Sequence, residues 1–279
     1  MPVLPVLPRS PPGSRNSGSQ GKIGARLLLF ANNWKSLGAE PWIVQVVSEG
    51  YKIPFLLPPP LSVSPVALTA YQPGSERFRA LEEEVTALIE KGAIVPVSDS
   101  VPAFYNRLFV VPKATGGWRP VLDVSRLNKF VDLTSFSMES SRSVLNAIRQ
   151  GDFLLTTDMK DGYFHIPIHQ ESQKFLRFVF QGKVFQFRAL PFGLSTAPQV
   201  FTRVIAFLGR LLRLRGVRVI LYLDDWLLLA GTIKEALRAK RILLELTDTL
   251  GIVLNLQKSC LDPAQVRTYL RMIIDKVGV

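Results

Sequence analysis

Cysteine and histidine are nearly absent from this 279-residue sequence, which contains only Cys260, His165 and His169. A single cysteine excludes an internal disulfide framework, and these three residues do not supply the four ligands of a structural zinc site. The protein is therefore neither a disulfide-stabilised scaffold nor a zinc protein. We expect it to work in a reducing, intracellular compartment, either the cytoplasm or the nucleus.

Long uninterrupted apolar runs are also missing. No stretch reaches the ~18 apolar residues that a membrane-spanning helix needs, and the proline-rich N-terminus lacks the basic start of a secretory signal peptide. We therefore expect neither secretion nor a membrane partner. With 47% hydrophobic residues and a mean hydropathy of +0.20, the chain nevertheless has enough apolar side chains to bury a large core.

Acidic residues are scarce in the middle of the chain. The net charge is +12, and residues 171–220 alone contribute +8, because one acid, Glu171, stands against nine basic residues. These nine are Lys174, Arg177, Lys183, Arg188, Arg203, Arg210, Arg213, Arg215 and Arg218. A basic block within a folded chain is typical of a protein that binds a polyanion, and nucleic acid is the leading candidate. The alternative is a basic face that only keeps the protein in solution.

Hydrophobic periodicity and helix-breaking residues divide the chain into three regions. Residues 1–21 are rich in Pro, Ser and Gly, which predicts a disordered leader. Residues 22–74 form an N-terminal extension with a proline-rich connector. In residues 75–279 the order of elements predicts an α+β domain, an antiparallel sheet backed by helices. Helices are expected at 75–91, 141–150, 196–215 and 232–250, and strands at 104–112, 118–124, 153–158, 175–180, 183–187, 217–223, 226–229, 252–256 and 266–274.

Two adjacent carboxylates, Asp224 and Asp225, lie between two apolar segments. Alternation of side chains predicts a strand at 217–223, and 226–229 has the composition of a second, so the acids fall where a hairpin would turn. Two charges among so many apolar residues are unfavourable unless they are compensated, and a metal ion compensates them best. The alternative is a solvent-exposed turn, in which Asp is common.

A third carboxylate, Asp158, ends the apolar strand expected at 153–158. If this strand neighbours the hairpin, all three acids meet at one end of the sheet. Such hard oxygen ligands suit Mg²⁺, and two ions can activate a 3′-hydroxyl and stabilise a leaving pyrophosphate. The pattern predicts a metal-dependent phosphoryl transferase acting on nucleic acid, and it does not separate a polymerase from a nuclease. Asp161 is expected to cap the turn or helix that follows.

A second group of candidate residues lies on the hairpin expected between 104 and 124. Its link, residues 113–117, contains two glycines suited to a tight turn, with Lys113 and Arg119 on either side. Cations on a protruding hairpin suit the binding of phosphates. The alternative is a sheet edge that carries charges only to remain in solvent.

Four motifs, WRPVLDVSRLNK, DMKDGYF, LPFGLSTAPQVF and YLDD, occur in this order and together resemble a reverse transcriptase over roughly Glu76 to Asp275. The upstream segment WIVQVVSEGYKIPF most resembles the region before the polymerase in DIRS-like (tyrosine-recombinase) retrotransposons. The resemblance implies a polymerase palm with a ferredoxin-like core, together with a fingers subdomain. It also implies an RNA-directed DNA polymerase that extends a primer on an RNA or DNA template with dNTPs. The RNase H and recombinase regions of a larger polyprotein would be its partners.

The resemblance also implies which residues carry the chemistry. Asp158, Asp224 and Asp225 would hold two Mg²⁺ ions, which Mn²⁺ could replace, with help from the carbonyl of Met159. Lys258 would protonate the leaving pyrophosphate. The alternative for Lys258 is an ordinary surface lysine.

A further set of residues is implied to bind the incoming nucleotide. Lys113 and Arg119 would hold its triphosphate. Tyr163 would lie beneath the sugar as the steric gate that excludes a 2′-hydroxyl, and its alternative is a tyrosine buried in the core. Phe192 and Gly193 would border the nucleotide and the template.

The sequence departs from the family at the primer grip. Family members usually read Tyr/Phe-Leu-Gly in this hairpin, whereas Arg271 follows Tyr269 and Leu270 here. The arginine either crowds the turn or adds a phosphate contact. The sequence stops where the thumb would begin, so we expect fingers and palm with an absent or truncated thumb. The alternative to an active polymerase is a catalytically inactive, truncated remnant that only binds nucleic acid.

Overall fold

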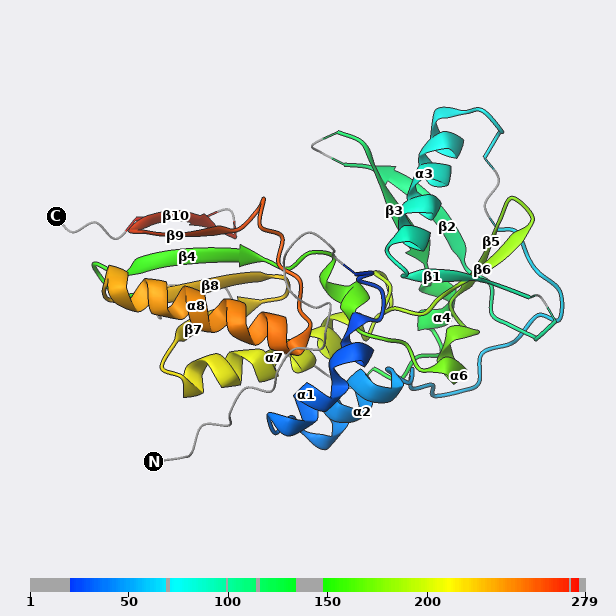
Figure 1. The fold of residues 1–279 in the computed structure, drawn as a ribbon. Helices are drawn as coiled ribbons and strands as arrows, with labels where there is room; N and C mark the ends of the chain where they lie inside the picture. The colour runs from blue at the N-terminus through cyan, green and yellow to red at the C-terminus, as the bar shows by residue number, and fades with distance from the viewer. Residues whose placement is uncertain are drawn as a thin grey trace.

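The structure is a computed structural model that describes residues 21–68, 71–98, 100–113, 116–133, 148–270 and 272–275. Residues 1–20 of the expected leader, most of the helix expected at 141–150, and Arg271 lie outside the described residues. Within the described ranges, no helix is long and apolar enough to cross a membrane. The predicted α+β architecture is confirmed, with helices packed on antiparallel sheets (Figure 1).

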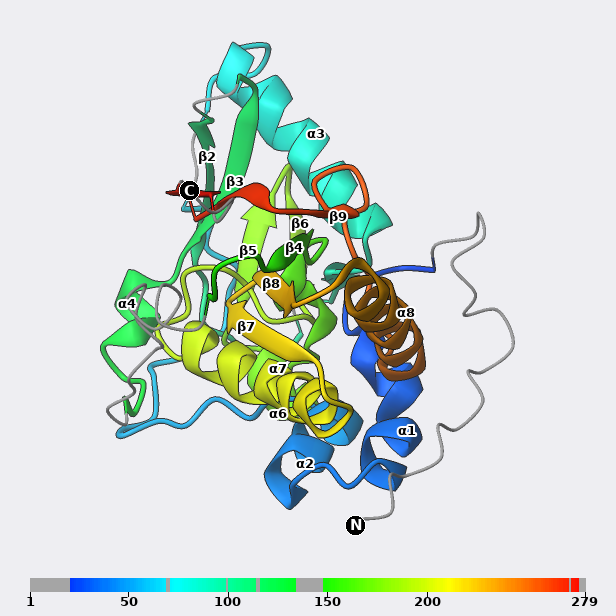
Figure 2. The same ribbon diagram turned by 90° about the vertical axis from the view of Figure 1, so that its left-hand side faces the viewer.

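A four-stranded antiparallel sheet with the order β7-β8-β4-β9 carries the three acids. Its strands are β4 (Phe153–Asp158), β7 (Arg218–Tyr222), β8 (Asp225–Ala230) and β9 (Cys260–Ala264). Two long helices, α7 (Ala197–Leu214) and α8 (Ile233–Leu250), cover one face of this sheet (Figures 1 and 2). In α7 the residues Val200, Val204, Leu208 and Leu211 recur at helical spacing, so they lie on one face of the helix, and all four are buried.

A second part of the molecule consists of a smaller sheet, a hairpin and a helix. The sheet has the order β1-β6-β5, formed by β1 (Ile94–Val97), β5 (Arg177–Phe180) and β6 (Lys183–Phe187). Strands β2 (Arg107–Pro112) and β3 (Trp118–Asp123) pair as the expected hairpin, and α3 (Glu76–Glu90) packs beside them. Short helices α4 (Ser125–Asn128), η2 (Gly162–His165) and α6 (Gln170–Gln173) connect these elements. Ser75 caps α3 as expected, accepting a hydrogen bond from the Phe78 amide at 3.3 Å.

The N-terminal residues form a helical segment that packs against α8. The segment contains the 3₁₀-helix η1 (Arg26–Phe30), α1 (Ala31–Ser36) and α2 (Pro41–Glu49). Figure 2 shows α1 beside α8. Trp34 is completely buried there, and its ring centroid lies 5.5 Å from that of Phe207 in α7. The segment therefore contributes side chains to the main hydrophobic core.

The C-terminal region differs from the sequence prediction. The strand expected at 252–256 does not form, and Leu254 instead makes a single bridge to Met159. The range 266–274 divides into a hairpin of β10 (Val266–Tyr269) and β11 (Met272–Asp275). The sequence does not indicate β9, because its residues include Asp262 and Pro263. Strand β9 lies at the edge of its sheet, where proline is tolerated.

Helix α8 begins and ends at residues that the sequence identifies. Thr232 Oγ1 accepts a hydrogen bond from the Glu235 amide at 3.2 Å, and the Glu235 carboxylate accepts one from the Gly231 amide at 3.0 Å. Gly251 ends the helix with φ of +76°, and a Cβ at this position would lie 2.2 Å from the ring of Phe30. Position 251 therefore requires glycine for both its backbone and its lack of a side chain.

We expect Gly251→Ala to lower the free energy of unfolding by about 3 kcal/mol, because it combines a left-handed backbone with a clash against Phe30. Gly38 offers a matched control, since its φ is +80° but an added Cβ would meet nothing within 4 Å. Gly38→Ala should therefore cost only about 1 kcal/mol. Urea unfolding followed by tryptophan fluorescence measures both changes. If the two variants lose equal amounts of unfolding free energy, the clash with Phe30 does not contribute to the effect.

Candidate active site

The hairpin of β7 and β8 presents two of the acids at its tip. Tyr222 pairs with Asp225, so Leu223 and Asp224 form a two-residue turn. Leu223 has φ of +50°, a left-handed conformation that is unfavourable for a leucine. The indole of Trp226, which is completely buried, donates a hydrogen bond to the Leu223 carbonyl at 2.8 Å. This bond holds the turn in its strained shape.

The third acid lies directly opposite the hairpin tip. Strand β4 pairs with β8 so that Asp158 faces Asp225, as expected if the two strands were neighbours. The amide of Met159 donates a hydrogen bond to the Asp224 carbonyl at 2.9 Å, which joins the end of β4 to the turn. Asp158, Asp224 and Asp225, called the carboxylate site below, therefore come together at one end of the sheet.

The members of the carboxylate site repel one another. Burial and, to a lesser extent, Asp224 raise the pKa of Asp158 above its usual range, although the charge of Lys258 opposes the shift. Burial, Asp224 and Asp158 raise the pKa of Asp225 in the same way. The described residues contain no set of three His, Cys, Asp or Glu side chains already arranged to hold a metal ion. Uncompensated charge on oxygen ligands is nevertheless what a hard divalent cation neutralises, so this donor set fits Mg²⁺.

A second stretch of chain, residues 251–259, also lies against the carboxylate site. The amide of Asn255 donates to the Asp158 carbonyl at 2.8 Å, and the Asp158 amide donates to Ser259 Oγ at 3.1 Å. The same stretch brings Lys258 close enough for its charge to lower the pKa of both Asp158 and Asp225. Sequence reasoning identified Lys258 but missed Asn255 and Ser259, and no local pattern marks either residue.

Tyr163 lies next to the acids in a group of aromatic rings. Its ring stacks on that of Phe192 at 4.6 Å and lies 5.0 Å from that of Phe201. Burial, together with the charge of Asp224, raises the pKa of Tyr163 to about 12, so its hydroxyl stays protonated. A Cβ on the neighbouring Gly162 would lie only 3.0 Å from the Phe201 ring. The lack of a side chain at 162 therefore lets this group pack against the acids.

Gly193 joins the loop before α7 to the second part of the molecule. Its φ is +97°, and a Cβ there would lie 2.9 Å from the Leu122 carbonyl. Asn128 donates a hydrogen bond to the Gly193 carbonyl at 2.9 Å and accepts one from the Ser195 amide at 3.0 Å. These contacts fix Phe192, whose ring is half exposed beside Tyr163.

The two cations of the β2–β3 hairpin stand apart from the acids. Arg119 faces Val111 across the hairpin, and the amide of Lys113 donates to the Gly117 carbonyl at 2.9 Å. Both side chains are exposed. In the part of the chain that the structure describes, no hydrogen bond or ion pair joins either side chain to the carboxylate site. The candidate residues therefore fall into two groups, one on each part of the molecule.

Asp161 does not act as the expected helix cap. It occupies the position before η2 with φ of +49°, and its carboxylate pairs with Lys91 Nζ at 2.9 Å instead. The left-handed backbone explains the difference, because a capping residue normally adopts an extended conformation. The pair with Lys91 ties this loop to the end of α3.

The expected primer-grip residues lie behind the carboxylate site. Tyr269 is buried, and its hydroxyl donates a hydrogen bond to the Asp225 carbonyl at 3.0 Å. It packs with Ile220 and Leu227 in a second hydrophobic cluster, against which the partly buried Leu270 also rests. The β10–β11 hairpin is therefore attached to the backbone of one of the acids.

The basic block at 171–220 does not act as one surface. Arg177 is buried and donates to Gln186 and to the Val101 carbonyl, and Arg218 pairs with the buried Asp152 at 2.7 Å. Arg177 is therefore excluded from the nucleic-acid surface that the basic block predicts, and Asp152 compensates the charge of Arg218. The spacing of charges along a sequence does not reveal which of them the fold uses internally.

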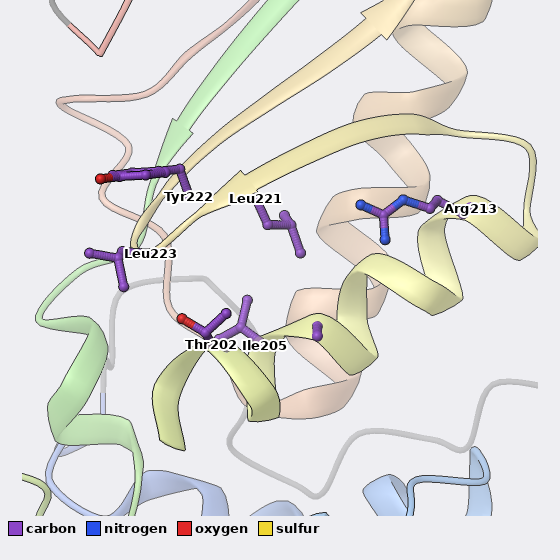
Figure 3. Close-up of a pocket in the computed structure, with 7 residues that line it drawn as sticks. Thr202, Ile205, Arg213, Leu221, Tyr222 and Leu223 are labelled. Carbon is purple, nitrogen blue, oxygen red and sulfur yellow. The ribbon is translucent and has the colours of Figure 1, made fainter. Parts of the chain in front are cut away.

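A small cavity of about 80 Å³ lies beneath the tip of the hairpin, between β7 and α7. Figure 3 shows Leu221 pointing from β7 toward α7, where Thr202 and Ile205 face it. Arg213 closes the far end and donates to the Val219 carbonyl at 3.1 Å. This hollow also reaches Tyr222 and Leu223, the residues just before Asp224.

Residues 111–272 match the family model described as "Reverse transcriptase (RNA-dependent DNA polymerase)". The chain belongs to the reverse transcriptase family. The matched range includes every candidate site residue from Lys113 to Leu270, and it leaves out the N-terminal helical segment. In the terms of this family, the four-stranded sheet corresponds to the palm, and the smaller sheet with the β2–β3 hairpin corresponds to the fingers.

Viral and transposon polyproteins of this family are similar to the chain. It is 26% identical over 199 residues to the Pro-Pol polyprotein of feline foamy virus, covering 71% of the chain and 16% of the polyprotein. It is 25% identical over 182 residues to the retrovirus-related Pol polyprotein from transposon 412 of Drosophila melanogaster, covering 62% of the chain and 14% of the polyprotein. The chain thus spans only a small part of the length of these relatives.

Solved reverse transcriptases share the fold. The crystal structure of prototype foamy virus protease-reverse transcriptase superposes with a TM-score of 0.63 at 26% identity, over 77% of this chain and 28% of that chain. A foamy viral protease-reverse transcriptase in complex with dsDNA superposes with a TM-score of 0.63 at 22% identity, over 95% of this chain and 57% of that chain. The second likeness extends the common fold over nearly the whole chain.

We expect Asp225→Asn to raise the free energy of unfolding at pH 7.5 without divalent cations. The pKa of Asp225 in the folded protein lies above its ordinary value of 3.8, so ionisation of this group opposes folding at neutral pH. The gain should shrink as the pH falls through the raised pKa, and it should vanish below 3.8, where both states bind the proton.

Urea unfolding between pH 7.5 and 3.5 measures this dependence. Glu83→Gln, on the exposed face of α3, removes an acid far from the site and should leave stability unchanged at either end of the range. If Asp225→Asn is no more stable than the wild type at pH 7.5, the acids do not repel one another as inferred.

Proposed function

We propose that the chain is the RNA-directed DNA polymerase unit of a retroelement, which adds dNTPs to a primer 3′ end by two-metal phosphoryl transfer. The observation that carries the proposal is the pairing of Asp158 with Asp225, which brings three acids to one end of the sheet inside the family-matched range. Membership of the reverse transcriptase family favours a polymerase over the nuclease that the acids alone would also allow.

In the proposed mechanism, Asp158, Asp224, Asp225 and the carbonyl of Met159 would hold two Mg²⁺ ions. When bound, the ions supply Lewis acidity to the primer 3′-hydroxyl and neutralise the leaving pyrophosphate. The raised pKa values of Asp158 and Asp225 support this assignment, because a cation relieves the repulsion that raises them. Lys258 Nζ, already near these carboxylates, stabilises the pyrophosphate and gives it a proton.

The incoming nucleotide lies between the two groups of candidate residues. Lys113 and Arg119 are exposed on the β2–β3 hairpin and bind its triphosphate oxygens. Tyr163 lies beneath the sugar, where its packing against Phe192 and Phe201 keeps the ring from moving aside for a 2′-hydroxyl. Phe192 and the glycine after it border the base pair.

The nucleic-acid partner in this proposal is a primer on an RNA or DNA template. Foamy viral protease-reverse transcriptases with this fold are described in complex with RNA/DNA hybrid and with dsDNA. Tyr269 and Leu270 hold the primer strand through the β10–β11 hairpin, which the bond from Tyr269 to Asp225 couples to the carboxylate site.

Three finer assignments belong to the same proposal. The segment WIVQVVSEGYKIPF favours a DIRS-like retrotransposon as the source of the chain. The similarity to polyproteins favours a longer product that contains this chain. The resemblance to DIRS-like elements adds RNase H and recombinase regions as its neighbours. The single cysteine favours an intracellular location.

We expect the wild-type chain to extend oligo(dT) on poly(rA) with Mg²⁺ and dTTP, and Asp225→Asn to lose at least about a hundredfold in rate, because one of the carboxylates that would hold the ions is gone. Glu83→Gln should extend like the wild type. Gel analysis of extension products measures the rates. If the wild type extends no better than Asp225→Asn, the polymerase proposal fails, and retained binding of the primer-template would identify a protein that only binds nucleic acid.

A separate prediction concerns the choice of sugar. Tyr163→Ala should raise the incorporation of ribonucleotides relative to deoxyribonucleotides by at least about tenfold, because the ring that excludes the 2′-hydroxyl is removed. Tyr163→Phe keeps the ring and should preserve the wild-type ratio. Single-nucleotide incorporation kinetics with dTTP and UTP give both ratios. An unchanged ratio in an active Tyr163→Ala variant removes the steric-gate role.

A further inference from the structure

Val253 is bonded through both of its backbone groups to the loop that follows Asp158. Its amide donates to His165 Nε2 at 3.1 Å, and its carbonyl accepts from the Lys160 amide at 3.0 Å. Two residues later, the Asn255 amide donates to the Asp158 carbonyl at 2.8 Å. These three hydrogen bonds, the first of them to His165, hold residues 251–259 against the carboxylate site.

His165 is suited to a permanent bridging role. Its side chain is completely buried, with Nδ1 at 3.2 Å from the Gly162 carbonyl. Because Nε2 accepts from Val253, the ring proton resides on Nδ1, where it can be donated to Gly162. Burial, reinforced by the charge of Arg26, lowers the pKa of His165 to about 4, so the ring stays neutral near pH 7. The ring therefore joins the loop containing Tyr163 to residues 251–259.

The other end of this stretch is fixed by the N-terminal helical segment. Arg26 Nε donates to the Gly251 carbonyl at 3.0 Å, Asn33 Nδ2 to Thr249 at 2.7 Å, and Trp34 Nε1 to Leu250 at 3.0 Å. These three consecutive carbonyls belong to the end of α8, where the backbone carbonyls no longer find N–H donors within the helix. Side chains that lie outside the family-matched range thus fix the position of the backbone at the start of residues 251–259.

We propose that His165 is a positioning residue of the polymerase site, and that Arg26, Asn33 and Trp34 provide the support against which it acts. Together they hold Asn255 and Ser259 against Asp158 and keep Lys258 beside the acids. The inference rests on the proposed function, and it assigns the helical segment that carries Arg26, Asn33 and Trp34 to the catalytic unit. Removal of the Nε2 acceptor should loosen Val253 and so let the Asp158 backbone move relative to Asp225.

Two substitutions at His165 separate positioning from packing. His165→Gln retains an acceptor near the Nε2 position, whereas His165→Asn reaches only the Nδ1 position and leaves the Val253 amide without its partner. Mn²⁺ binding, followed by electron paramagnetic resonance in the absence of nucleotide and primer, reports on the carboxylate site directly. Loss of an outer-shell partner typically weakens metal binding by about 10- to 100-fold.

We expect His165→Asn to bind Mn²⁺ about tenfold more weakly and to lower kcat for primer extension by a similar factor, with KM for dTTP unchanged. His165→Gln should remain within about threefold of the wild type in both measurements. Ser172→Ala is the matched control. It removes the 3.0 Å bond that the Ile53 amide donates to Ser172 Oγ, a bond that anchors the chain after the N-terminal helical segment and involves none of residues 251–259. It should bind Mn²⁺ like the wild type.

Wild-type Mn²⁺ affinity in a folded His165→Asn variant overturns the inference and leaves the proposed function intact. Equal weakening in the Gln, Asn and Ser172 variants also overturns it, because the effect would then be general loosening. If His165→Asn does not fold, Trp34→Phe tests the same support, since it keeps a ring against Phe207 and loses only the bond to Leu250. Wild-type Mn²⁺ affinity in Trp34→Phe would also contradict the inference. Absence of Mn²⁺ binding by the wild type overturns the proposed function together with the inference.

Discussion

Repulsion among three carboxylates is the constraint on which the rest of this structure depends. Asp158, Asp224 and Asp225 share one end of a sheet, and burial together with their mutual charge raises the pKa of two of them. Such an arrangement is unfavourable in the protein alone, and it persists only because neighbouring contacts fix the backbone that carries each acid. Strain of this kind is characteristic of sites that bind a charged partner.

The contacts that fix this backbone come from three directions. The Trp226 indole restrains the turn by its hydrogen bond to the Leu223 carbonyl. The Tyr269 hydroxyl restrains the start of β8 by its hydrogen bond to the Asp225 carbonyl. Asn255 holds the end of β4 from the side. Through these contacts all three residues affect the chemistry without touching the reacting atoms. Each of these bonds restrains the main chain and does not itself occupy a carboxylate oxygen.

The acidic centre could be predicted from the sequence because it depends on local patterns. Alternating side chains marked the strand before Asp224, and an apolar run marked the strand that ends at Asp158. The residues that support the acids could not be predicted in this way. Ser259 accepts a hydrogen bond from Asp158, which lies 101 residues earlier in the sequence. Arg177 is not available at the surface, because the fold buries it. Such roles are set by tertiary contacts, which leave no periodic signal.

The bonds at the end of α8 also bear on the order in which the molecule can fold. Arg26, Asn33 and Trp34 reach partners that lie 216 to 225 residues further along the chain. During synthesis these side chains leave the ribosome long before Thr249 and Gly251 exist, and contacts of such separation form slowly. Until then Trp34 can pack against Phe207, but the polar atoms of these three side chains lack their partners at the end of α8. The first described residues to be made therefore complete their native contacts only once the end of α8 is in place.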